Sequence, residues 1–224
     1  MERYYSQKLS GDRLRLCYEV APPRVKQYLE AEIEYVLGKI KPPDLVLEIG
    51  CGYGRVHDRL QSKVNTVVGI DTSFTSISLA RNDLCKNPRC DLFVMDAIEL
   101  GFCGRQFDMV VCIQNGISAF GVDQRKLIAE AMRVTRSGGA VLFSSYSERF
   151  WEDRLDWFRI QSQEKLIGEI DEEATGNGVI VCKDGFKAGK VSPDDFIELT
   201  SDLAIDPIIT EVDNSSVFYE LRTW

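Results

Sequence analysis

Three glycines alternate in the segment DLVLEIGCGYGRV, where Gly50, Gly52 and Gly54 follow an apolar run that also holds Glu48. Glycine has no Cβ, so the backbone of such a turn can bend sharply and approach a ligand closely. The free amide groups of a glycine-rich turn that opens a helix can also be directed at an anion or a carboxylate. The segment therefore predicts a ligand-binding turn for a dinucleotide or another adenosyl compound.

Two aspartates extend this candidate site. Asp71 ends the apolar segment VVGID, and Asp96 lies near the end of the segment FVMDA. A carboxylate can accept hydrogen bonds from both hydroxyls of a ribose, and Asp71 has the spacing at which nucleotide-binding folds place such an acid. Each aspartate alone could equally cap a helix or form a turn. Together with the glycines, the two acids favour a bound ligand.

The elements that must position these residues are visible as alternating patterns. Apolar residues recur at three-to-four spacing over residues 23–40, which predicts a helix. Short, continuously apolar runs then alternate with helical patterns over residues 44–146, which predicts a parallel sheet buried on both faces. The fold class is therefore α/β, and the glycines and aspartates fall at the carboxyl ends of strands, where open α/β sheets bind ligands.

The pattern changes after Tyr146. Residues 147–192 are rich in aromatic and charged side chains and are interpreted as an inserted helix followed by a hairpin. Residues 193–224 are expected to form a helix and two antiparallel strands. The aromatic side chains of the insertion, with Tyr4, Tyr5 and Tyr18, are expected to line a pocket, although ordinary packing explains the same composition equally well.

The glycine pattern separates two ligand classes. A dinucleotide fold requires a glycine five residues after the first one, where this chain has Arg55. The E-x-G-x-G-x-G pattern that begins at Glu48 instead resembles the first motif of the class I S-adenosylmethionine-dependent methyltransferases. The two acids, the fourth-strand segment FDMVVCIQN and the segment RVTRSGGAVLFSS then follow in that family's order. The resemblance is strong over residues 44–146 and looser over the two closing strands.

This resemblance implies a doubly wound, Rossmann-like, seven-stranded and mostly parallel sheet with one reversed strand, in which residues 44–146 form the S-adenosylmethionine-binding core and 193–224 the helix and strands that complete the sheet. Residues 147–192 go beyond this minimal fold. We expect them to form an inserted cap over the site, together with residues 1–43 as an N-terminal helical segment that is part of the lid. The implied activity is methyl transfer from S-adenosylmethionine to a small-molecule O- or N-acceptor, with S-adenosylhomocysteine as the product.

The resemblance also implies the site residues. The cofactor-binding set is Glu48, Gly50, Cys51, Gly52, Gly54, Asp71, Thr72, Asp96, Ala97, Ile113 and Gln114. Glu48 and the glycine backbone are implied near the methionine portion, Asp71 at the ribose, and Asp96 with Ala97 at the adenine.

The acceptor site is less defined by the sequence. Asn115, Tyr146 and Tyr18 are its candidate residues, although the dipeptide Asn115-Gly116 is also typical of a turn. Arg55 and His57 are interpreted as exposed or capping residues of the first helix of the core. No catalytic residue and no metal ligand is assigned, because methyl transfer depends largely on positioning and water exclusion.

Other function classes are carried as alternatives. An NAD-dependent oxidoreductase is opposed by Arg55, and a non-catalytic subunit that binds the adenosyl ligand and recruits a partner is a third class. An aminopropyl transferase would need an acidic pair after the fourth strand, which the segment CIQNGIS lacks. The same segment lacks the prolines found there in enzymes that methylate the amino groups of nucleic-acid bases.

The amino-acid composition limits the kinds of partner that we expect for this protein. Among 224 residues, 35 acidic against 27 basic side chains give a net charge of −8, so no nucleic acid is expected. A signal peptide and a membrane span of ~18 apolar residues are lacking, which predicts a cytoplasmic protein without a membrane partner. Seven cysteines without a Cys-x-x-Cys pair, and a single histidine, indicate buried reduced thiols rather than a zinc site. The oligomeric state is left open.

Overall fold

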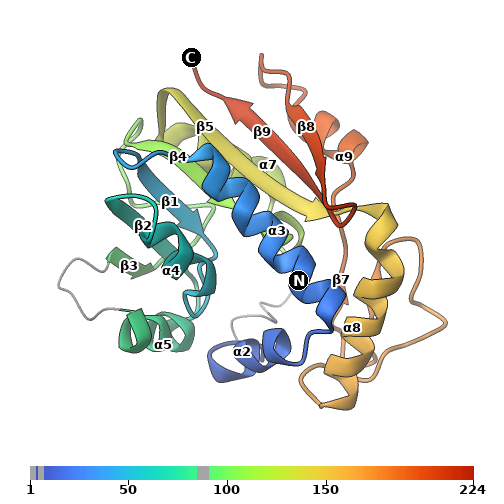
Figure 1. Cartoon of the computed structure of the whole chain (residues 1–224). Helices are drawn as coiled ribbons and strands as arrows, with labels where there is room; N and C mark the ends of the chain where they lie inside the picture. Colours follow the sequence, from blue (N-terminus) through green and yellow to red (C-terminus); the bar gives the residue numbers. More distant parts are fainter. Residues whose placement is uncertain (1–3, 5–7, 85–90) are drawn as a thin grey trace.

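The computed structural model describes residues 4, 8–84 and 91–224. Within them, a seven-stranded sheet has the spatial order β3-β2-β1-β4-β5-β9-β8 (Figure 1). Its strands are β1 (Leu45–Ile49), β2 (Thr66–Asp71), β3 (Asp91–Val94), β4 (Phe107–Cys112), β5 (Thr135–Tyr146), β8 (Ile208–Val212) and β9 (Ser216–Arg222). Strands β1 to β5 pair in parallel, whereas β9 pairs antiparallel with both β5 and β8. The expected α/β class and the reversal of one strand in this sheet are confirmed.

Helices cover both faces of the sheet, so its central strands β1 and β4 are buried and largely apolar (Figure 1). Helices α3 (Pro23–Lys39) and α4 (Arg55–Gln61) lie on one face, and α7 (Gln124–Val134) and α9 (Pro193–Leu199) lie on the other. Successive strand residues alternate between these two cores, as Val46 and Leu47 do. Helices α5 (Phe74–Leu84) and α6 (Gly116–Ala119) follow β2 and β4.

The residues after β5 form a cap beside the sheet. The cap consists of the 3₁₀ helix η1 (Glu148–Phe150), α8 (Trp151–Gln163) and the hairpin of β6 (Ile180–Val181) and β7 (Lys187–Ala188). Helix α2 (Asp12–Glu19) packs against the cap, and the indole Nε1 of Trp157 donates a hydrogen bond of 2.8 Å to the backbone oxygen of Cys17. A hydrophobic cluster joins α2, α3, α8 and the hairpin, so the N-terminal segment and the cap form one packed unit.

The thiols differ from the expectation in one case. Five cysteines are free in the described part of the chain, and Cys103 is exposed because it lies in the loop between β3 and β4. The other four are buried as expected: Cys17, Cys51, Cys112 and Cys182. Cys85, Cys90 and Tyr5 lie outside the described residues. Where the chain is described, no helix has both the length and the apolar character needed to cross a bilayer.

Candidate functional site

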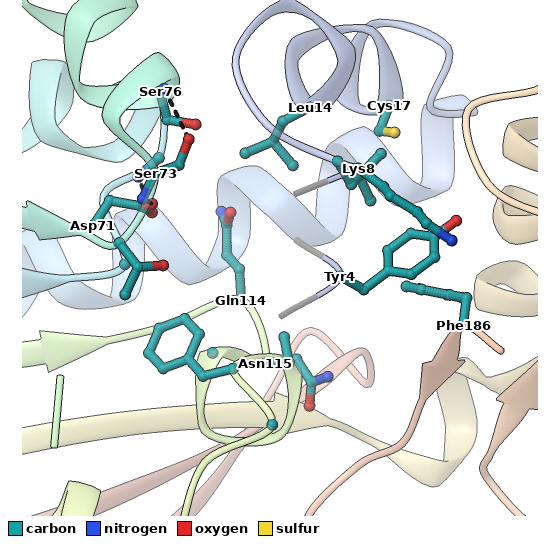
Figure 2. A pocket seen from close by; sticks show the side chains of 18 of the residues that line it. Tyr4, Lys8, Leu14, Cys17, Asp71, Ser73, Ser76, Gln114, Asn115 and Phe186 are labelled. Atoms are coloured by element: carbon teal, nitrogen blue, oxygen red, sulfur yellow. Dashed lines mark hydrogen bonds between the residues drawn. The ribbon is translucent and has the colours of Figure 1, made fainter. Parts of the chain in front are cut away.

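A cavity of about 300 Å³ begins at the carboxyl ends of the strands and continues beneath the cap. Its strand end is lined by Gly50, Gly52, Asp71, Thr72, Ser73, Asp96 and Ala97. Its cap end is lined by Tyr4, Lys8, Tyr18, Tyr146, Trp157, Phe158, Gln161 and residues 184–187. Figure 2 shows Asp71 and Ser73 on one side, Tyr4 and Phe186 on the opposite side, and Gln114 between them.

The glycine turn forms the floor of the strand end. Gly50, Gly52 and Gly54 have φ angles of 79°, 54° and 90°, in the left-handed region that glycine adopts readily. The amide N–H groups of Gly50 and Cys51 both donate to the backbone oxygen of Ile70, over 2.8 and 2.9 Å. A Cβ at Gly50 would lie 2.4 Å from Cζ of Phe120, a ring that also lines the cavity. Only glycine therefore allows the turn to lie this close to the opposite wall.

Asp71 links the glycine turn to the start of α5. Its Oδ2 accepts a hydrogen bond of 3.1 Å from the amide of Gly52, and its Oδ1 accepts one of 2.7 Å from the amide of Ser73. Burial raises the pKa of Asp71 above its usual value, although the two amide donors act in the opposite direction. Because each carboxylate oxygen has two acceptor positions, one remains on each for a ligand.

The loop after β3 completes the strand end. The Oδ1 of Asp96 accepts a hydrogen bond of 3.2 Å from the amide of Ile98, which fixes the carboxylate at the rim of the cavity. The buried Ala97 and the neighbouring Met95 add apolar lining beside it. This part of the site can therefore hold a flat polar group against small and flexible apolar side chains.

The turn after β4 lies between the two ends and is conformationally strained. Gln114 and Asn115 have φ angles of 57° and 63°, which are unfavourable for residues with a Cβ. The amide of Gln114 donates to Oε2 of Glu32 over 2.7 Å and to Oγ of Ser144 over 2.8 Å. The side chain of Asn115 accepts from Ser145 Oγ over 2.8 Å and donates to a backbone oxygen of the cap over 3.1 Å. Asn115 therefore positions this turn as well as lining the cavity.

Glu32 is the buried carboxylate beneath this turn. It comes from α3 and has no exposed surface. Burial raises the pKa of Glu32 from its ordinary value of 4.5 to about 7, although hydrogen bonds to the carboxylate act in the opposite direction. The geometry of the strained turn thus depends on a group that titrates near neutral pH.

The cap end is lined mainly by aromatic side chains. The ring of Tyr18 lies between those of Tyr53 and Trp157, with both centroids 6.0 Å away. The hydroxyl of Tyr4 donates a hydrogen bond of 2.7 Å to Asp184, which connects the N-terminal segment to the hairpin. The rings of Tyr4 and Phe186 also pack at 4.8 Å between centroids. The cap end thus has walls of aromatic rings, with Lys8, Gln161, Asp184 and Lys187 as polar side chains among them.

The structure separates the predicted residues into two groups. Those that line the cavity are Gly50, Gly52, Asp71, Thr72, Asp96, Ala97, Ile113, Gln114, Asn115, Tyr146 and Tyr18. Glu48, Cys51 and Gly54 do not line it. Cys51 packs in a small apolar cluster against α5 and β3, and a Cβ at Gly54 would lie 2.5 Å from Leu84 Cδ1, so these two shape the turn from behind.

His57 corrects the expectation of an exposed or capping residue. It is fully buried, and its Nδ1 lies 3.2 Å from Oε2 of Glu48. Room for the imidazole comes from Gly69 on β2, where a Cβ would lie 2.9 Å from Nδ1. Arg55 is partly buried, with its guanidinium 4.6 Å from the ring centroid of Tyr18. Both residues therefore support the site from within the fold.

Sequence reasoning missed two buried polar residues, one in the wall of the cavity and one beneath it. The sequence did not indicate Gln161, because the apolar residues of α8 are unevenly spaced. In the structure, the buried face of this helix includes Arg154, Trp157, Phe158 and Gln161. Nothing in the sequence distinguishes Glu32 as a buried residue, since its neighbours in the same amphipathic helix include exposed glutamates. Such positions become visible only when the helix is packed against the sheet.

Comparison with known proteins finds similarity to proteins described as methyltransferases. Residues 46–139 match a family model described as a methyltransferase domain. The human "Probable tRNA methyltransferase 9B" is 33% identical over 122 residues, which cover 54% of this chain and 23% of that protein. The "2-methyl-6-phytyl-1,4-hydroquinone methyltransferase" of Synechocystis is 26% identical over 159 residues, which cover 63% of this chain and 49% of that protein. This chain thus spans less than half the length of either relative.

A solved structure agrees in fold. The crystal structure of a putative S-adenosyl-L-methionine-dependent methyltransferase from Methanococcus maripaludis superposes with a TM-score of 0.65. The alignment covers 93% of this chain and 91% of that chain at 14% identity. The seven-stranded architecture with flanking helices is therefore common to both proteins.

Proposed function

We propose that this chain, which belongs to the class I S-adenosylmethionine-dependent methyltransferases, transfers the methyl group of that cofactor to an oxygen or nitrogen of a small molecule. The observation that carries the proposal is the two-ended cavity. Its strand end offers carboxylates and a glycine turn, whereas its cap end is lined mainly by aromatic rings. Two ligands of different chemistry can therefore meet in one enclosed space.

The residues of the strand end fit S-adenosylmethionine. Asp71 retains an acceptor position on each oxygen, which suits the two hydroxyls of a ribose. The buried Nε2 of Gln114 has no hydrogen-bond partner among the described residues and belongs to a side chain that lines the cavity, so a ligand can supply the acceptor. We assign cofactor binding to Gly50, Gly52, Asp71, Thr72, Asp96, Ala97, Ile113 and Gln114.

The chain's own contribution to the reaction is position and exclusion of water. When bound, S-adenosylmethionine supplies a methyl group on a positively charged sulfur, and an acceptor atom attacks the methyl carbon from the side opposite that sulfur. The hydroxyl of Tyr4 and the ammonium of Lys8 both approach Asp184, at 2.7 and 3.9 Å, and hold the N-terminal segment against the hairpin over the cap end. Enclosure of this kind aligns an acceptor and keeps water out, so no dedicated base is required for an acceptor that is already ionised.

A small acceptor fits this cavity better than a nucleic acid. The cap and the N-terminal segment cover the cap end, and the chain's net charge of −8 repels a polyanion. The hydroquinone named for the Synechocystis relative is an acceptor of the small kind, whereas the human relative's name specifies tRNA. Both kinds of acceptor therefore belong in the test.

Calorimetric titration with S-adenosylmethionine, S-adenosylhomocysteine and NAD tests the cofactor first. We expect roughly micromolar binding of the two adenosyl ligands and none of NAD. Asp71→Ala should weaken S-adenosylhomocysteine binding by about 1–3 kcal/mol through lost hydrogen bonds. Asp58→Ala, on the exposed side of α4, is the control and should bind as the unchanged chain does.

Three results would contradict the proposal. Binding of NAD alone would show that the glycine turn holds a dinucleotide. Unchanged affinity in a folded Asp71→Ala protein would remove this residue from the site. Release of S-adenosylhomocysteine with tRNA but with none of a panel of small phenols, carboxylic acids and amines would replace the small acceptor by a nucleic acid.

A further inference from the structure

Helix α8 presents an unpaired amide to the cap end. Gln161 lies about one helical turn after the adjacent Trp157 and Phe158, and all three line the cavity. Gln161 is 3% exposed, and its Nε2 has no hydrogen-bond partner among the described residues. Buried amide groups are nearly always paired in folded proteins. This donor is therefore available to a ligand in the cavity.

Flat apolar surfaces surround this amide. The rings of Phe158 and Phe186 are stacked at 27°, with their centroids 5.9 Å apart. Trp157 packs against Tyr18 with 6.0 Å between centroids, and Tyr146 lines the same space. Ring walls of this kind bury the body of an aromatic or otherwise flat apolar molecule. The cap end thus combines an apolar slot with the buried amide donor of Gln161.

The charges that line the cap end favour anions over cations. Lys8 and Asp184 offset each other as an ion pair, and Lys187 adds one positive charge. That carboxylate already accepts from the hydroxyl of Tyr4 over 2.7 Å and from the amide of Phe186 over 3.2 Å, and it lies 3.9 Å from the ammonium of Lys8. Asp184 is therefore committed to holding the hairpin and the N-terminal segment together.

A buried guanidinium behind the ring wall adds to this bias. The guanidinium of Arg154 lies 4.2 Å from the ring centroid of Tyr146 and 5.6 Å from that of Phe158. A cationic ligand on the opposite faces of these rings would be repelled by it across a short, poorly solvated distance.

We infer that the cap end selects a flat, largely apolar acceptor that carries a neutral or anionic oxygen group, such as a phenol or a carboxylic acid, and rejects protonated amines. Gln161 determines this specificity by donating its amide hydrogen bond to that oxygen. That this ligand accepts a methyl group rests on the proposed function. The ligand preference is a property of the cavity, and binding measurements alone can test it.

Calorimetric titration of the full chain, saturated with S-adenosylhomocysteine, tests this preference. The probes are 2-naphthoate, 2-naphthol and 2-naphthylmethylammonium, which share one ring system and differ in charge. Naphthoate and naphthol should bind at least about tenfold more tightly than the ammonium compound. Gln161→Leu keeps the approximate volume without the donor and should weaken naphthoate binding about tenfold.

Two further variants complete the experiment. Gln163→Leu removes an exposed amide from the same helix and should leave all three affinities unchanged. Gln161→Glu places a carboxylate of the same shape in the slot and should reverse the preference in favour of the ammonium compound. If Gln161→Leu does not fold, the ranking of probes on the unchanged chain and on Gln161→Glu still decides the matter.

Equal or tighter binding of the ammonium compound by the unchanged chain would overturn the inference. Unchanged naphthoate affinity in a folded Gln161→Leu protein would overturn the role of this residue. Failure of S-adenosylhomocysteine to bind would instead contradict the proposed function, and the same probes titrated without it would still rank the ligand classes.

Discussion

Replacing Glu32 by glutamine tests how the structure holds the strained turn after β4. Glu32 is fully buried on α3, and its Oε2 accepts a hydrogen bond of 2.7 Å from the amide of Gln114. Burial raises its pKa from 4.5 to about 7. Glutamine has nearly the same shape, keeps a carbonyl oxygen that can accept this bond, and carries no charge. The substitution therefore removes the buried charge and leaves the packing in place.

The size and sign of the effect follow from the two pKa values. Below pH 4.5, Glu32 holds its proton in both the folded and the unfolded chain. Its contribution to the free energy of unfolding is then at its maximum. Between pH 4.5 and about 7 the unfolded chain releases the proton first, and the free energy of unfolding falls until the folded protein ionises too. At about 1.4 kcal/mol for each tenfold change in proton affinity, the loss amounts to about 3 kcal/mol.

Urea unfolding of both proteins at pH 5 and pH 8 measures this effect. From pH 5 to pH 8, the free energy of unfolding should fall by about 2–3 kcal/mol more in the unchanged chain than in Glu32→Gln. The other titrating groups are the same in both proteins and cancel in this comparison. Glu34→Gln is the matched control, since it removes the same charge from the exposed side of the same helix. Its difference from the unchanged chain should be the same at both pH values.

A pH-independent difference between Glu32→Gln and the unchanged chain would refute this reasoning. It would mean that Glu32 is ionised to the same extent in the folded and unfolded states, and that solvent reaches the carboxylate. Equal pH dependence in Glu34→Gln would likewise show that burial is not the cause.

Two further substitutions test the turn and the cap. Gly50→Ala combines a φ of 79° with a Cβ 2.4 Å from Phe120 and should lower the free energy of unfolding by at least about 1 kcal/mol and weaken S-adenosylhomocysteine binding. Gly38→Ala in α3 meets open space and should be neutral or stabilising in the same urea and calorimetric measurements, so equal effects of the two would contradict the strain argument. Arg154→Met removes the donor of three hydrogen bonds to the backbone oxygens of Gly178, Ala188 and Gly189 and should cost at least about 3 kcal/mol in urea unfolding. Arg159→Met on the exposed side of α8 should cost less than about 1 kcal/mol, and a similar loss in both would show that Arg154 does not hold the cap.

The strand end illustrates what a local pattern can predict. The alternating glycines follow β1, Asp71 ends β2 and Asp96 lies two residues after β3, and parallel strands bring their carboxyl ends to one edge of the sheet. The cavity therefore appears where the sequence predicts it. Glu48 shows the limit of the pattern, because its side chain turns away from the cavity toward His57 inside the core.

The sequence alone determined the α/β class, the order of strands and helices, and the edge of the sheet that carries the glycine turn, because these follow from hydrophobic periodicity and glycine spacing within short segments. Only the tertiary structure decided which polar side chains are buried. Glu32, His57, Arg154 and Gln161 look like ordinary helical surface residues in the sequence. Their partners lie far away along the chain, so their burial depends on how α3, α4 and α8 pack against the sheet and the cap.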